Sequence, residues 1–132
     1  MTLVDTSVWI DFFAARDTHP VAFLESLIEQ GEELCLCGVI LTEVLQGIRD
    51  DTQYDKTSAI FSNLIFLPMN RATFFIAASI YRTLRSKGIT IRNSIDCMIA
   101  AVCIEQKVRL LHNDRDFDHI GRTVDLDIVT AV

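Results

Sequence analysis

Leu3-Val4-Asp5-Thr6-Ser7, close to the amino terminus, joins a strand pattern to a helix pattern. Adjacent apolar residues without alternation are typical of a buried strand in a parallel sheet. Thr6 or Ser7 is a suitable cap for a helix that continues to Phe13. We therefore expect Asp5 at the carboxyl end of a strand, where open α/β sheets bind ligands. A simpler role for Asp5, helping to cap the helix, stays open at this point.

The rest of the chain alternates apolar runs of strand length with segments of helical spacing. The expected strands end near residues 37, 67, 111 and 129. Expected helices follow at 20–30, 39–48, 52–64, 71–87 and 94–106. Strands that alternate with helices favour a parallel sheet covered on both faces. We predict one α/β domain over residues 1–132, a three-layer α/β/α sandwich with a central, mainly parallel sheet.

Caps and apolar faces are predicted for several of these helices. Asn70 is the expected cap of the helix at 71–87, and Asp51 or Thr52 is that of the helix at 52–64. In the helix at 20–30, helical spacing predicts a buried face of Val21, Leu24, Leu27 and Ile28. In the helix at 71–87, it predicts a buried face of Phe74, Ala77, Ala78, Tyr81 and Leu84.

Composition excludes several classes of protein. Half of the 132 residues are hydrophobic, and glycine and proline total only seven, which argues against disorder. No apolar run approaches the ~18 residues that span a bilayer, and Asp5 interrupts the start, so neither a membrane span nor a signal peptide is visible. The cytoplasm is the expected location. The cysteines lack the C-x-x-C spacing of zinc or redox sites, which predicts buried free thiols at Cys35, Cys37, Cys97 and Cys103.

The net charge of −6 is unevenly distributed. Residues 1–70 hold three basic and eleven acidic side chains, whereas residues 71–122 hold nine basic and five acidic ones. A polyanion could therefore approach one side of the molecule despite its overall charge. The arginines could equally form ordinary solvated helix faces.

Acidic side chains recur at the expected carboxyl edge of the sheet. Asp5 and Asp114 each follow an expected strand. Asp96 lies in the first turn of the helix that precedes the strand leading to Asp114. Glu43 lies in an otherwise apolar helix and needs a partner if it is buried. Carboxylates this close together need a counter-charge, and a divalent cation with oxygen ligands supplies it. Capping, turn formation and a salt bridge remain the alternatives for the individual residues.

Four segments together resemble the PIN domain, and more narrowly the VapC toxins of bacterial toxin–antitoxin pairs. They are Leu3 to Ile10, the Thr42-Glu43 pair, Asp96-Cys97-Met98-Ile99-Ala100-Ala101 and Asn113-Asp114-Arg115-Asp116-Phe117. The resemblance covers essentially the full length. It implies a magnesium-dependent endoribonuclease, with manganese as a substitute, that hydrolyses loops of transfer or ribosomal RNA. It also implies a VapB-like antitoxin as partner, with DNA contacted only through that antitoxin. From the apolar surface we expect a homodimer.

The resemblance also assigns roles to residues. Asp5, Glu43, Asp96 and Asp114 match the acidic quartet of the family, and all four are expected metal ligands. Asp116 matches an additional catalytic acid, and Ser7 and Asn93 match supporting polar positions. His112 departs from the family pattern, and we consider a contact with the substrate for it. Arg92 and Arg115 lie close in sequence to the acids, so we expect both at the cleft rim holding phosphates, with Arg82, Arg85 and Lys87 extending the basic strip.

Three other readings are weighed. A receiver-type phosphoacceptor domain would need two acids after the first strand and a lysine after a late one, whereas Asp5 stands alone and no lysine follows Leu111. A phosphatase with Asp5 as nucleophile would need an acid at position 7, which is Ser7. A catalytically inactive PIN-like scaffold that only binds protein remains the main alternative, and the complete acidic quartet argues against it.

Overall fold

The computed structural model describes residues 1–129 and has a parallel sheet at its centre. The strand order is β3-β2-β1-β4. The strands are β1 (Thr2–Val4), β2 (Leu34–Leu36), β3 (Ile65–Phe66) and β4 (Arg109–Leu111). Beyond β4, Ile128 forms a parallel bridge with Leu110, at the predicted edge strand. Because β1 pairs with both β2 and β4, Leu3 and Val4 are completely buried, as the unbroken apolar pattern predicted.

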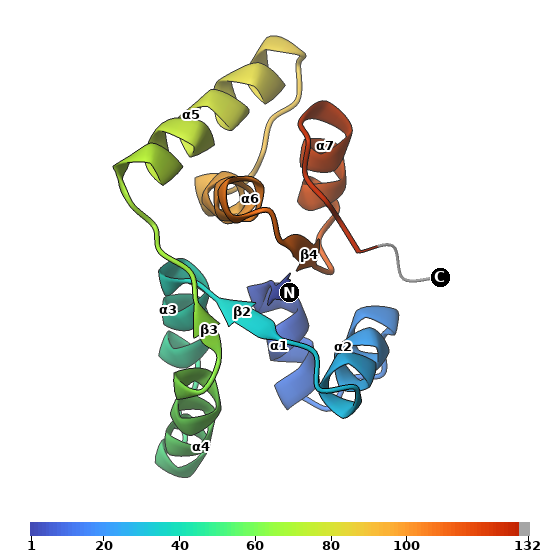
Figure 1. Cartoon of the computed structure of the whole chain (residues 1–132), viewed down its shortest axis with the longest axis vertical. Helices are drawn as coiled ribbons and strands as arrows, with labels where there is room; N and C mark the ends of the chain where they lie inside the picture. Colours follow the sequence, from blue (N-terminus) through green and yellow to red (C-terminus); the bar gives the residue numbers. More distant parts are fainter. Residues whose placement is uncertain (130–132) are drawn as a thin grey trace.

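Seven helices surround the sheet within residues 1–129. They are α1 (Thr6–Phe13), α2 (His19–Glu29), α3 (Gly38–Gln46), α4 (Asp51–Ser62), α5 (Arg71–Ser86), α6 (Ser94–Gln106) and α7 (Arg115–Thr123). Figure 1 shows the strands in the middle of the molecule, α1 to α4 in its lower half and α5 to α7 in its upper half. The predicted α/β/α architecture with a parallel sheet is confirmed.

Two helix caps differ from the sequence prediction. Asp5 caps α1 in place of Thr6 or Ser7, which is the role left open for it, because its carboxylate accepts a hydrogen bond from the Ser7 backbone N–H. Asp50 caps α4 in the same way, one residue before the predicted position. In both cases the carboxylate that precedes the first turn reaches the orphan N–H groups of that turn. The predicted cap of α5, Asn70, is confirmed.

The buried face of α5 is rotated from the predicted one. It consists of Thr73, Ala77, Ile80 and Leu84, whereas Phe74 is 46% exposed. Thr73 is tolerated in the interior because its hydroxyl donates to the Glu105 carboxylate at 2.6 Å and accepts from the Asn70 N–H. Ile28 on α2 is likewise exposed, contrary to the expected apolar face.

The four cysteines are free and buried, as predicted. Among residues 1–129, no helix is both long enough and apolar enough to span a lipid bilayer.

Candidate active site

All five predicted acids line one cleft of about 360 Å³. Asp5 follows β1, Asp114 follows β4, and Asp96 lies in the first turn of α6. Asp116 lies in the first turn of α7, and Glu43 reaches the cleft from within α3. Parallel strands bring their carboxyl ends to the same edge, which explains why residues more than a hundred positions apart meet here.

Asp5 is more deeply buried than Asp114, the other acid that follows a strand. Its side chain is 5% exposed and accepts hydrogen bonds from both the backbone N–H and the hydroxyl of Ser7. The Ser7 hydroxyl in turn accepts from the Asn113 N–H at 3.0 Å, which ties the start of α1 to the loop after β4. Burial raises the pKa of Asp5, although the Ser7 hydrogen bonds oppose that shift. Ser7 therefore orients Asp5.

Asp96, Asp114 and Asp116 form the tightest cluster. One carboxylate oxygen of each lies within 4.8 Å of the others. The pKa of Asp96 rises from 3.8 to about 7, first through burial and then through the negative charges of Asp5, Asp114, Asp116 and Glu43. Burial and the neighbouring carboxylates thus both disfavour the ionised form of Asp96. An all-oxygen, anionic donor set of this kind fits a magnesium or manganese ion.

Glu43 and Asn93 are each held by a local hydrogen bond. The Thr6 hydroxyl donates to Glu43 at 2.9 Å and so fixes that carboxylate beside Asp5. Asn93 caps α6 by accepting from the Ile95 N–H at 3.0 Å, which orients the turn that carries Asp96. Glu43 is only partly buried, and within residues 1–129 it forms no salt bridge, which sets aside the salt-bridge alternative.

Arg92 lies within the cleft, in contact with the acids. Its guanidinium donates to both oxygens of Asp114 at 3.1 and 3.2 Å and to Asp116 at 3.2 Å. The side chain is 67% exposed, whereas that of Asp116 is 7% exposed. The structure thus places Arg92 on the carboxylates, not free at the rim as the sequence predicted.

Two other predicted residues lie outside the set that lines the cleft. Arg115 is exposed on the first turn of α7. His112 is buried against Phe117, its Nδ1 accepts from the Asp114 N–H at 3.1 Å, and its Nε2 lies 3.4 Å from an Asp118 oxygen. Burial lowers the pKa of His112. In this arrangement His112 supports the loop that carries Asp114 and does not line the cleft.

Sequence reasoning missed two residues that line the cleft, Thr6 and Ile10. Thr6 was considered only as a helix cap, yet its hydroxyl holds Glu43. Ile10 is 48% exposed and gives the cleft an apolar side. Its position one turn after Thr6 on the same helix was the available signal.

An apolar groove lies at the amino-terminal ends of β2 and β3, the opposite edge of the sheet from the acids. It has a volume of about 700 Å³, and its lining includes Trp9, Phe12, Ile28, Ile60 and Leu64. Ile28 and Ile60 are 48% and 44% exposed. Helix α1 supplies Ile10 to the cleft and Trp9 to the groove, so the two sites share this helix.

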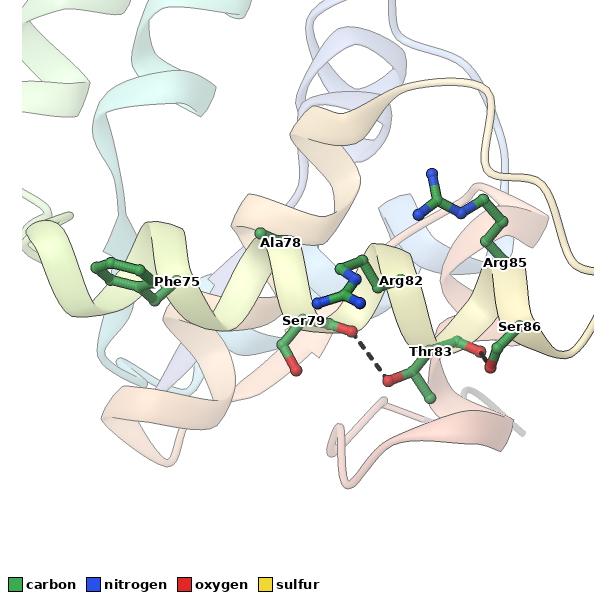
Figure 2. A pocket seen from close by; sticks show the side chains of 7 residues that line it. All are labelled: Phe75, Ala78, Ser79, Arg82, Thr83, Arg85 and Ser86. Atoms are coloured by element: carbon green, nitrogen blue, oxygen red, sulfur yellow. Dashed lines mark hydrogen bonds between the residues drawn. The ribbon is translucent and has the colours of Figure 1, made fainter.

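A hollow of mixed polarity lies on the exposed face of α5. Figure 2 shows that the side chains lining this hollow all come from α5, with Phe75 at one end and Arg82 and Arg85 toward the other. Phe75 is 71% exposed. Small residues, Ala78 and Ser79, lie between them.

Comparison with known proteins identifies the family. Residues 2–123 match the PIN domain family. A VapC ribonuclease of Mycobacterium bovis and ribonuclease VapC11 of Mycobacterium tuberculosis are each 35% identical to this chain over 128 residues, 96% of either protein.

Solved structures share the fold. VapBC2 from Rickettsia felis, crystallised with a DNA fragment from its promoter, has a TM-score of 0.76 at 20% identity. VapBC-1 from Haemophilus influenzae has a TM-score of 0.74 at 20% identity, and both matches cover 97% of this chain and 96% of the other. The predicted resemblance is confirmed: this chain belongs to the PIN-domain family and, within it, to the VapC ribonucleases.

Proposed function

We propose that this chain is the toxin of a toxin–antitoxin pair and that it hydrolyses RNA internally at the acidic cleft with a divalent metal ion. The observation that carries the proposal is the convergence of five carboxylates in one cleft at the carboxyl edge of the sheet. Related proteins are named as VapC ribonucleases, which supports the reaction class. Membership of this family also sets aside the receiver-type and phosphatase readings.

Asp5, Asp96, Glu43 and Asp114 would hold the metal, and Asp116 fits the same cluster because its carboxylate lies against those of Asp96 and Asp114. Magnesium is the expected ion, with manganese as a substitute. When bound, such an ion would supply a water activated for attack and positive charge opposite the phosphoryl group. Ser7, Thr6 and Asn93 hold the acids in place through the hydrogen bonds described above. Hydrolysis by this route leaves a 5′-phosphate and a 3′-hydroxyl.

The substrate would be a single-stranded loop of a transfer or ribosomal RNA. A loop bends into a narrow cleft more easily than a duplex does, and its phosphates become accessible one at a time. Arg92 and Arg115 are the basic residues proposed to hold phosphates: Arg92 lines the cleft, and Arg115 is exposed in the first turn of α7. Ile10 would contact a base or sugar from the α1 side.

The direct test is cleavage of short RNA loops by the purified protein. Asp5→Asn should lose most of the magnesium-dependent cleavage, because it keeps the shape of the side chain but removes one negative charge. Circular dichroism should show that the variant is folded. Parental cleavage rates in Asp5→Asn would contradict the metal assignment, and a 2′,3′-cyclic phosphate product would contradict hydrolysis by metal-activated water. A folded wild-type chain that binds its antitoxin but cuts no RNA would favour the inactive scaffold.

The apolar groove is the proposed binding site of a VapB-like antitoxin. Its exposed Ile28 and Ile60 fit the apolar face of an amphipathic segment. A chain that continued from the groove past α1 to the carboxyl edge of the sheet could place an arginine or lysine on the acids. Ile60→Asp should weaken antitoxin binding at least tenfold while leaving RNA cleavage intact. DNA would be contacted by the antitoxin alone.

A homodimer is proposed through the outer face of α5. A second copy of α5 would cover Phe75, and the small Ala78 and Ser79 would let the two helices approach closely. We assign this face to a second copy in preference to an RNA strip because the apolar side chain of Phe75 is 71% exposed on it. Phe75→Asp should shift the protein from dimer to monomer in light scattering, with antitoxin binding as the internal control. A parental chain that is monomeric at micromolar concentration would contradict the proposal.

A further inference from the structure

Arg92 is bound to two of the carboxylates that the metal site needs. It makes three hydrogen bonds, two to Asp114 and one to Asp116. Asp114 and Asp116 both belong to the cluster whose oxygens lie within 4.8 Å of each other. Within the described residues no other cation pairs with Asp114 or Asp116, so the guanidinium is the resident counter-charge of this part of the cleft.

The backbone at Arg92 is fixed, whereas its side chain is free to move. Ile91 is 3% exposed and anchors the loop in the core, and Asn93 caps α6. The side chain itself is 67% exposed and makes its contacts only at its tip. Although Asp116 is buried, the guanidinium itself is exposed, so water solvates it once it leaves the acids. Arg92 can therefore leave the acids without any change in the fold.

A guanidinium and a divalent cation cannot share these oxygens. Both are attracted to the negative charge of Asp114 and Asp116, and two positive groups at that distance repel each other. We propose that Arg92 is a built-in competitor of the metal: it neutralises Asp114 and Asp116 in the metal-free protein, is displaced when the ion binds, and is then available to an RNA phosphate. This inference rests on the proposed metal-dependent function and adds a coupling between metal and substrate binding.

The coupling predicts effects of opposite sign from one substitution. Arg92→Ala should bind manganese about threefold to tenfold more tightly, because the ion no longer has to displace the guanidinium. The same variant should bind RNA more weakly in the presence of metal, because one phosphate contact is lost. A merely structural role for Arg92 would weaken both, together with a lower melting temperature.

Manganese affinity is measured by titration calorimetry on RNA-free protein. Arg115→Ala is the matched control, because it removes the same charge next to Asp114 without touching the acids of the cluster. Arg92→Lys keeps the charge but loses the bidentate geometry of the guanidinium. Its manganese affinity should lie between those of the parent and Arg92→Ala. Equal manganese affinity in Arg92→Ala and the parent would overturn the proposal, as would an equal gain in Arg115→Ala.

Displacement is followed directly through the Nε–H signal of Arg92 in nitrogen-15 spectra, assigned by its loss in Arg92→Lys. Magnesium at saturation should shift this signal and speed its exchange with water, because the hydrogen bond to Asp116 is broken. An unchanged signal would refute displacement. Competition without any RNA cleavage would leave this inference standing and refute the proposed nuclease, so the two failures are distinguishable.

Discussion

Replacing Asp96 with Asn should stabilise the metal-free protein at alkaline pH. Asp96 has a pKa of about 7 in the folded chain, against an ordinary value of 3.8. A group whose folded pKa is raised stays protonated in the folded state after the unfolded chain has ionised. The contribution of Asp96 to stability is therefore most favourable below pH 3.8, falls as the pH rises toward 7, and stays at its lower level above that. Asn cannot ionise and removes this loss.

The size of the effect follows from the same values. The gap between 3.8 and about 7 corresponds to at most about 4 kcal/mol at about 1.4 kcal/mol for each pKa unit. Asp96 also lies in the first turn of α6, where a carboxylate gains about 0.5 kcal/mol from the helix dipole, which Asn loses. We expect a net gain of about 1 to 3 kcal/mol at pH 8, or about 3 to 10 °C in melting temperature. The gain should shrink steadily as the pH falls toward 4.

The assay is thermal unfolding in EDTA at pH 4.5, 6 and 8. Asp125→Asn, an exposed acid that does not line the cleft, controls for the change in net charge. Magnesium should raise the melting temperature of the parent more than that of Asp96→Asn, because the ion supplies the charge that the variant no longer needs. Equal melting temperatures of parent and Asp96→Asn at every pH would refute the reasoning that the clustered carboxylates destabilise the fold.

Three further predictions concern the scaffold. Arg109 joins the amino ends of β1 and β4, because it donates to Glu32 at 2.9 Å and to Thr2 at 2.8 Å. Arg109→Ala should therefore lower the free energy of unfolding by about 1 to 3 kcal/mol in urea titrations. Arg109→Lys should lose less. Asn70→Ala removes the cap of α5 and should cost about 1 kcal/mol in the same measurement; parental stability would contradict the cap. The native cysteines should react slowly with a thiol reagent at pH 8 and quickly in urea, because they are buried and burial raises the pKa of Cys37 to about 11. Fast labelling of the native protein would show that these thiols are accessible.

Local rules were sufficient to bring the acids together. A strand pattern followed by Asp5 or Asp114, and a helix opened by Asp96, need only the rule that parallel strands end at one edge. The pairing of Arg92 with Asp114 and Asp116 was beyond such rules. These residues are 22 and 24 positions apart, and only the path of the loop before α6 decides whether the guanidinium faces solvent or the acids.

Helix α7 shows where a local pattern misled. No helix was expected between residues 115 and 123, and turn formation was left open for Asp114 and Asp116. The segment is helical because Phe117 and Ile120, three residues apart, both lie fully buried in the core. The rotation of α5 has a similar cause. Apolar spacing favoured Phe74, whereas Glu105 on another helix satisfies Thr73 and lets it occupy the interior.

Capping and metal binding were treated as alternatives for the acids, but the structure makes them compatible. Asp5 caps α1 and Asp114 caps α7, while Asn93 caps the helix that carries Asp96. Three helices therefore direct their N-termini at the cleft, where their N–H groups and dipoles favour negative charge. This compensation is incomplete, because the pKa of Asp96 is still about 7. The helices thus allow the carboxylates to assemble without a metal, and the remaining negative charge is what a divalent cation would neutralise.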